Sequence, residues 1–95
     1  MRIVFDPRAA GDIVSQIDYL IEQNAVQAAT RLKLRCDAFF EDFLALHPRA
    51  GKHIAARDIW ECWIPGTRLV IWYRFTEDEL QIIRIWHAAQ DRERG

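Results

Sequence analysis

The spacing of apolar residues changes abruptly at His47-Pro48, and this change constrains the fold more than any other feature of the chain. Before it, apolar residues recur at three- and four-residue intervals, the spacing of one buried face of an α-helix. After it, short runs rich in β-branched and aromatic residues alternate with polar residues, as strands do. Helices followed by strands predict an α+β domain whose helices pack on one face of an antiparallel sheet.

Two helices are predicted before this point. Asp6 can cap the first helix by accepting a backbone hydrogen bond, and Pro7 suits the first helical position, where no amide donor is needed. This helix is expected to end near Asn24, because asparagine tolerates the left-handed conformation of a helix terminus. The second helix is expected to continue to Leu46 as an antiparallel neighbour of the first. Its apolar stripe consists of Ala25, Ala29, Leu32, Cys36, Phe39, Phe43 and Leu46.

Strands are predicted at the N-terminus, over residues 2–5, and after the helices, over residues 54–64, 68–75 and 80–87. The last three form a meander, to which the N-terminal strand can be added. The expected fold class is α+β in the order β-α-α-β-β-β, a helical hairpin packed on a small, mainly antiparallel sheet. Residues 1–95 are the length of one small domain, so a single domain is expected.

Alternation along the last two strands assigns their side chains to two faces of the sheet. The face toward the helices is expected to hold Leu69, Ile71, Tyr73, Phe75, Ile83 and Ile85. The opposite face is expected to hold Val70, Trp72, Arg74, Ile82, Arg84 and Trp86. Arginine and tryptophan together are typical of binding hot spots, which favours a recognition surface. In the other interpretation, each arginine covers a tryptophan ring by a cation–π contact.

Cysteine content and charge limit the classes of function. Cys36 and Cys62 belong to no Cys/His cluster with zinc-ligand spacing, so both are expected to be buried free thiols of a cytoplasmic protein, and no metal site or cofactor is predicted. No apolar run approaches the roughly 20 residues that cross a bilayer, so no membrane association is expected. The formal net charge of −1 disfavours a nucleic-acid partner unless a local basic patch exists.

Three parts of the chain carry a likeness to a known family. They are the segment 13–20 leading into Ala28-Ala29, the group Leu46, Pro48 and Gly51, and the segment 69–74 followed by 82–91. In this order and spacing they resemble the RelE/ParE superfamily of bacterial type II toxins, and the ParE branch more closely. The third part looks like the final strand and His-containing exit of ParE-like toxins. The resemblance covers essentially the whole chain.

The resemblance implies the toxin component of a type II toxin–antitoxin system. ParE-like members are understood to poison DNA gyrase, so gyrase inhibition by binding is expected. A cognate antitoxin is expected to lay an amphipathic helix against the first helix or to add a strand to the open sheet edge. Oligomerisation through the antitoxin stays open. The partner-binding residues are expected to be Trp72, Arg74, Arg84, Trp86 and Arg57.

RelE-like members cut messenger RNA on the ribosome, which offers an enzymatic alternative. Metal-independent cleavage needs a base, an acid and cations that stabilise the phosphorane. Here His87 is the candidate acid and Glu61 the candidate base, and the charge stabilisers would come from among Arg84, Arg74, Arg57 or Lys52. The slightly acidic chain and the exit of the last strand into Ala88-Ala89 favour a binder over a nuclease. A third interpretation is an inactive or redirected binding module of the same fold.

Overall fold

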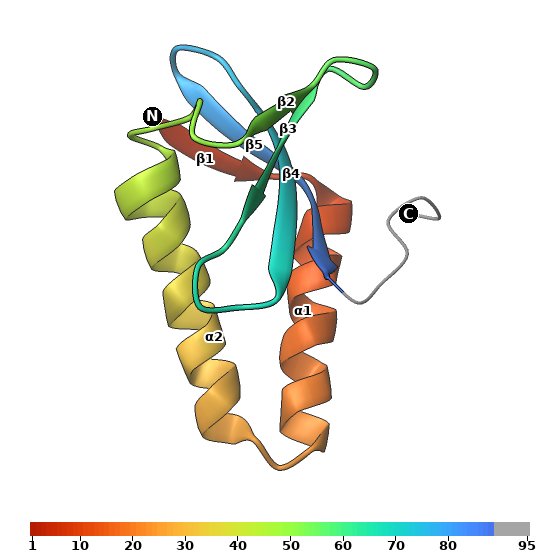
Figure 1. Ribbon diagram of the computed structural model, residues 1–95. Coiled ribbons are helices and arrows are strands. Elements are labelled where there is room, and N and C mark those ends of the chain that lie inside the picture. The colour runs from red at the N-terminus through yellow and green to blue at the C-terminus, as the bar shows by residue number, and fades with distance from the viewer. Residues whose placement is uncertain (89–95) are drawn as a thin grey trace.

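A helical hairpin covers one face of a five-stranded sheet in the computed structural model, which describes residues 1–88 (Figure 1). In chain order the elements are β1 (Arg2–Phe5), α1 (Pro7–Glu22), α2 (Val26–Ala38), the π-helix η1 (Phe39–Leu44), β2 (Lys52–Ile54), β3 (Ile59–Trp63), β4 (Leu69–Phe75) and β5 (Glu79–His87). The sheet order is β1-β5-β4-β3-β2, with β1 parallel to β5 and every other pair antiparallel. The predicted fold class is confirmed, with one additional strand.

The helical hairpin begins and turns at the predicted residues. Asp6 caps α1 by accepting a hydrogen bond from the Arg8 backbone N–H at 2.9 Å, and Pro7 occupies the first helical position. Asn24 lies in the left-handed region with φ 57°, between α1 and α2. Because so short a connection leaves the helices side by side, they run antiparallel as predicted (Figure 1).

The second helix does not remain an α-helix up to Leu46, as the sequence had predicted. From Phe39 it continues as the π-helix η1, whose backbone hydrogen bonds reach five residues back instead of four. The wider turn brings Phe40 and Leu44 into the core, where they are 1% and 0% exposed. The end of the predicted apolar stripe is consequently left in solvent, with Phe43 42% and Leu46 69% exposed.

A β-bulge in β5 overturns two of the predicted face assignments. Trp72 pairs with Arg84 but Tyr73 pairs with Ile82, so Ile83 is an extra residue in β5. Such an insertion shifts the alternation of faces by one residue. Ile82 is therefore fully buried beneath the helices, and Ile83 packs on the opposite face, the reverse of the prediction for each.

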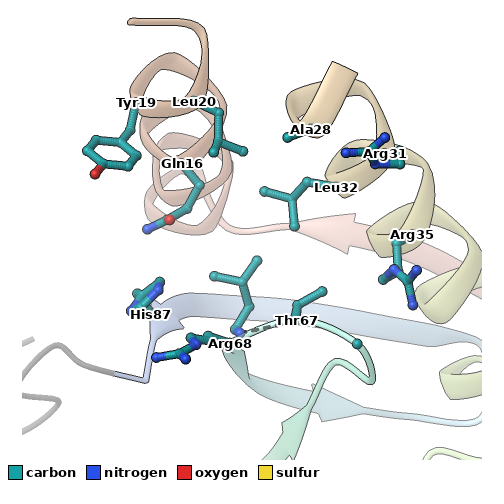
Figure 2. A pocket seen from close by; sticks show the side chains of 12 residues that line it. Gln16, Tyr19, Leu20, Ala28, Arg31, Leu32, Arg35, Thr67, Arg68 and His87 are labelled. Atoms are coloured by element: carbon teal, nitrogen blue, oxygen red, sulfur yellow. Dashed lines mark hydrogen bonds between the residues drawn. The ribbon is translucent and has the colours of Figure 1, made fainter. Parts of the chain in front are cut away.

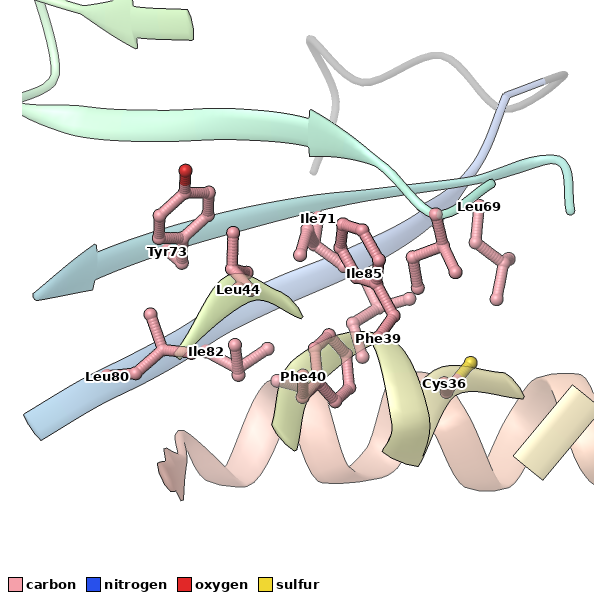
Figure 3. Close-up of a cluster of buried hydrophobic side chains, with 12 residues drawn as sticks. Cys36, Phe39, Phe40, Leu44, Leu69, Ile71, Tyr73, Leu80, Ile82 and Ile85 are labelled. Carbon is pink, nitrogen blue, oxygen red and sulfur yellow. The ribbon is translucent and has the colours of Figure 1, made fainter. Parts of the chain in front are cut away.

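The main core lies between the helices and the sheet (Figure 3). Its buried members are Ala9, Cys36, Phe39, Phe40, Leu44, Ile64, Leu69, Ile71, Tyr73, Leu80, Ile82 and Ile85. Both cysteines are free, as predicted, although Cys62 is half-buried and Cys36 alone of the two is fully buried. Burial, with a smaller effect of the Asp37 carboxylate, raises the pKa of Cys36 to about 11.

The predicted strand over residues 54–64 is two strands. β2 ends at Ile54, and a turn containing Asp58 in the left-handed region, with φ 49°, reverses the chain into β3. The turn allows Lys52 of β2 to pair directly with Glu61 of β3. The meander therefore has four strands, and β2 forms its free edge.

Tyr73 ties the loop before β2 to the centre of the sheet. Its hydroxyl donates to the Pro48 carbonyl at 2.7 Å and accepts from the Gly51 backbone N–H at 3.1 Å. A Cβ added to Gly51 would lie 2.6 Å from both the Glu61 carbonyl oxygen and the Tyr73 hydroxyl, so this approach requires glycine. Burial raises the pKa of Tyr73 to about 12.

Replacing Tyr73 with phenylalanine is expected to lower the free energy of unfolding at neutral pH by about 1–3 kcal/mol, because two backbone groups lose their partner. The free energy of unfolding of the variant is also expected to fall less than that of the wild type as pH rises into the alkaline range. The fold favours the protonated phenol, so this group's stabilisation is present below its ordinary pKa of 10.0 and is lost as pH rises toward about 12. Removing the hydroxyl removes that loss.

Urea unfolding at neutral pH and at about pH 11 would measure both effects. Cys36 also lowers the stability of both proteins as pH rises above 9, because its pKa is 9.0 in the unfolded chain and about 11 in the fold. Tyr19→Phe is the matched control, since Tyr19 is 59% exposed. An identical alkaline decline in wild type and Tyr73→Phe would contradict the assignment.

Candidate functional site

The sheet face turned away from the helices carries a second apolar cluster. Ile59, Trp72 and Trp86 form its buried centre, and Ile54 and Ile83 pack against it. The two indole rings meet edge-on, with their centroids 5.2 Å apart. Because Trp72 and Trp86 are 9% and 5% exposed, they are mostly withdrawn from the surface on which the sequence had placed them as binding residues.

Arginine side chains cover these tryptophans. The guanidinium carbon of Arg57 lies 5.0 Å from the Trp72 ring centroid, and that of Arg84 lies 4.4 Å from the Trp86 ring centroid. Trp72 also donates its indole N–H to Glu61 Oε2 at 2.7 Å. Within residues 1–88, the buried Trp86 indole N–H finds no hydrogen-bond partner. The cation–π contacts that the second interpretation predicts are therefore present at both tryptophans.

Arg84 is held by Asp12 of α1. Its Nε and Nη2 donate to the two Asp12 carboxylate oxygens at 2.9 and 3.2 Å, and the Ile85 backbone N–H donates to Asp12 Oδ2 at 2.9 Å. β1 pairs with β5 as far as Ile82, so beyond this point Asp12 occupies the edge where a strand would otherwise bond. The hydrogen bonds and charge of Asp12 raise the pKa of Arg84. This cation is thus compensated within the fold.

An open depression of about 400 Å³ lies over this cluster. We call it the arginine hollow; it is lined by Arg8, Arg57, Ile59, Trp72, Arg74, Ile83 and Arg84. Arg74 donates to the backbone carbonyls of Asp58 and Arg57 at 2.8 and 3.2 Å, and these bonds hold its guanidinium in place. Among residues 1–88, neither Arg57 nor Arg74 forms an ion pair. The hollow therefore presents two positively charged guanidinium groups, those of Arg57 and Arg74, in fixed positions.

The structure separates the residues that the sequence had grouped as catalytic candidates. Arg74 and Arg84 line the arginine hollow, and Glu61 pairs with Trp72 on that same face. Lys52 lies at the sheet edge, directly across from Glu61. His87 pairs with a core residue of β4 and lines a cleft on the helix side of the sheet. The candidate acid thus lies on the opposite face from Arg57, Arg74 and Arg84. Ala89, to which the last strand was expected to lead, lies outside the described residues.

That cleft, of about 600 Å³, lies between α1, α2 and the turn that joins β3 to β4 (Figure 2). We call it the basic cleft; it is lined by Gln16, Tyr19, Leu20, Ala28, Arg31, Leu32, Arg35, Gly66, Thr67, Arg68, Leu69 and His87. The sequence did not indicate this cleft, because charged residues opposite the apolar stripe of a helix usually face solvent. The four-residue spacing of Arg31 and Arg35, one helical turn, was the available signal.

No helix within residues 1–88 is long and apolar enough to cross a membrane. In the same part of the chain, no group of three or more His, Cys, Asp and Glu side chains is placed to hold a metal ion.

Comparison with known proteins identifies the family. A family model described as the ParE toxin of the type II toxin–antitoxin system, parDE, matches residues 3–92. A solved structure, the chromosomal ParDE TA system from P. aeruginosa, matches with a TM-score of 0.67 and 16% sequence identity, covering 92% of this chain and 95% of that chain. No curated protein sequence matches. Since the family model spans nearly the whole chain and the fold agrees with that of the ParDE structure, the chain belongs to the ParE toxin family of type II toxin–antitoxin systems.

Proposed function

We propose that this ParE-family toxin inhibits DNA gyrase by binding it through the arginine hollow, and that a cognate antitoxin keeps it inactive in the cytoplasm. The observation that carries the proposal is the pair Arg57 and Arg74, two guanidinium groups without ion pairs among residues 1–88. Both are held in place, one against the Trp72 ring and the other by two backbone carbonyls. A pre-positioned guanidinium loses little side-chain entropy on binding a carboxylate.

The placement of the ionisable groups supports binding over RNA cleavage. A nuclease needs its acid, base and charge stabilisers around one phosphate. Here His87 lines the basic cleft, whereas Arg74 and Arg84 line the arginine hollow on the other face of the sheet. Arg84 is also engaged by Asp12 at 2.9 Å.

The same face also favours a protein target over a nucleic acid. Proteins that bind single strands usually stack bases on exposed aromatic rings. Trp72 and Trp86 are 9% and 5% exposed and are covered by arginines, so neither offers such a ring. The net charge of −1 also differs from the strongly basic character of most nucleic-acid-binding domains. Carboxylates on a protein surface are the better match for the free guanidinium groups.

The double variant Arg57→Glu, Arg74→Glu is expected to raise the toxin concentration that half-inhibits gyrase supercoiling by about 30-fold, because each reversal turns an attraction into a repulsion. Arg49→Glu is the matched control: Arg49 is exposed and stacks on Phe75 at 5.5 Å, but it does not line the hollow. Thermal melts of both variants would verify folding.

Three outcomes would overturn parts of this proposal. No effect of excess wild-type toxin on supercoiling would reject gyrase as the target. Equal potency of wild type and the folded double variant would reject the arginine hollow as the contact surface. Translation-dependent RNA cleavage by the purified chain would reject the binding mechanism in favour of the nuclease. The antitoxin is tested separately, by co-expression with the short reading frame beside the toxin gene: failure of its product to copurify would reject that partner.

A further inference from the structure

We propose that Trp72 and Glu61 are positioning residues of the arginine hollow, which hold the Arg57 guanidinium where a carboxylate of the target binds it. This inference rests on the gyrase contact proposed above. Trp72 is 9% exposed and lies beneath the Arg57 guanidinium, and Glu61 does not line the hollow. Neither side chain is therefore placed to touch the target, so each acts on binding through Arg57.

Charge pairing within the hollow determines which arginines are left for the target. Arg8 and Arg84 each form an ion pair with an aspartate of the fold, at N–O distances of 3.8 and 2.9 Å. Among residues 1–88, Arg57 and Arg74 form none. The hollow therefore has two uncompensated positive charges, and a carboxylate is an ion that a guanidinium can bind through two parallel N–H donors.

The two uncompensated guanidinium groups are held in different ways. Arg74 is fixed by its hydrogen bonds to two backbone carbonyls, at 2.8 and 3.2 Å. Arg57 is exposed in the turn between β2 and β3, and its guanidinium carbon lies 5.0 Å from the centroid of the Trp72 ring. A long side chain that becomes ordered only on binding loses rotamer entropy at that moment. Because the ring orders Arg57 before the target arrives, this loss is smaller.

The backbone that carries Arg57 is anchored on both sides of the turn. Arg74 donates to the carbonyls of Arg57 and Asp58, and Asp58 lies in the left-handed region with φ 49°. On the β2 side, His53 Nε2 lies within hydrogen-bond distance of Asp58 Oδ1, at 3.2 Å. The backbone of the turn is thus fixed independently of Trp72. The position of the Arg57 guanidinium then depends on its side-chain rotamer, which the Trp72 ring restricts.

Glu61 in turn fixes the orientation of the ring. Glu61 and Trp72 are directly paired across β3 and β4, and Trp72 Nε1 donates to Glu61 Oε2 at 2.7 Å. A hydrogen bond to a charged acceptor is stronger than one between neutral groups. The Trp86 ring meets the Trp72 ring edge-on, at a centroid distance of 5.2 Å. These two contacts keep the indole face beneath Arg57, a role for Glu61 that differs from the catalytic base that the sequence had suggested.

Gyrase supercoiling measured with toxin variants tests this series of contacts. Trp72→Leu is expected to raise the toxin concentration that half-inhibits gyrase by about fivefold, the factor that an exposed cation–π contact supplies. Glu61→Leu is expected to raise it by about threefold. Glu61→Gln should recover most of the wild-type potency, because its amide oxygen can still accept from the indole N–H. Trp60→Leu is the matched control: Trp60 is a partly buried tryptophan that packs on the helix side of the sheet, and its replacement should leave the potency unchanged.

The same changes in an Arg57→Ala background distinguish positioning from direct contact. If Trp72 and Glu61 act through Arg57, their replacement in this background is expected to change the potency by less than about twofold. Losses as large as those in the wild-type background would overturn the inference, because they would show an effect on binding that does not involve Arg57. The gyrase proposal would then still stand.

Nuclear magnetic relaxation of the arginine Nε–H bonds in the free toxin measures the positioning without gyrase. The order parameter of the Arg57 Nε–H bond is expected to be high in wild type and Glu61→Gln and to fall in Glu61→Leu, which serves also if Trp72→Leu melts below the wild type. An unchanged order parameter in Glu61→Leu would overturn the inference and leave the gyrase proposal standing. Failure of the wild-type toxin to inhibit supercoiling would overturn both.

Discussion

Replacement of Phe40 with alanine is expected to lower the free energy of unfolding by about 3–5 kcal/mol, the usual cost of removing a buried phenylalanine. Phe40 is 1% exposed and lies at the junction of η1, β1 and the sheet. Its ring meets those of Phe5 and Phe39 edge-on, with centroid distances of 5.6 and 6.3 Å. Small domains have a total stability of about 5–15 kcal/mol, so much of the fold's stability depends on this side chain.

Urea unfolding of Phe40→Ala beside Phe43→Ala would measure this effect. Phe43 is the same residue type in the same π-helix but is 42% exposed, so its truncation should cost about 1 kcal/mol or less. If the second helix kept α-helical spacing to its end, as the sequence stripe had indicated, Phe43 would be the more sensitive position. Equal losses, or a larger loss at Phe43, would contradict the π-helical packing.

Asp12→Ala is expected to destabilise the domain by about 2–4 kcal/mol, because it leaves both the largely buried Arg84 guanidinium and the Ile85 backbone N–H without their acceptor. The carboxylate accepts from Arg84 at 2.9 and 3.2 Å and from the Ile85 backbone N–H at 2.9 Å. The Asp12 and Arg84 side chains are 18% and 19% exposed, so solvent replaces these bonds incompletely.

Asp12→Asn separates the two losses, because the amide oxygen can still accept from the Ile85 N–H while the negative charge is gone. The free energy of unfolding of Asp12→Asn, measured with urea, is expected to lie between those of wild type and Asp12→Ala. Asp18→Ala is the control: Asp18 is an exposed acidic residue on the same helix, and its truncation should change stability by about 0.5 kcal/mol or less. Losses of similar size for Asp12→Ala and Asp18→Ala would show that the strand edge does not depend on Asp12.

Together, the arginine hollow and the basic cleft place two cationic surfaces on opposite faces of one sheet. Among residues 1–88, five of the six arginines without an ion pair line these two sites, and the sixth, Arg49, lies over the Phe75 ring.

Local patterns in the sequence were sufficient to predict the start of α1, the turn between the two helices, and the strands β1, β4 and β5. Asp6-Pro7 and Asn24 act within a few residues of themselves, so their effects can be predicted without knowing the rest of the molecule. The change in the spacing of apolar residues at His47-Pro48 likewise indicates which side chains must be buried in each part of the chain. These signals, with the family resemblance, led to the correct fold class and to the ParE branch.

The tertiary structure decided what depends on residues far apart in the chain. The extra residue Ile83 is visible only in the pairing of β4 with β5, and this shift exchanged the faces of Ile82 and Ile83. Arg84 appeared to be a free binding residue, but its partner Asp12 is 72 positions away. The basic cleft similarly needs two helices and a distant turn. Alternation and helical spacing encode which side of an element is buried, whereas register, charge pairing and cavities arise only when elements pack together.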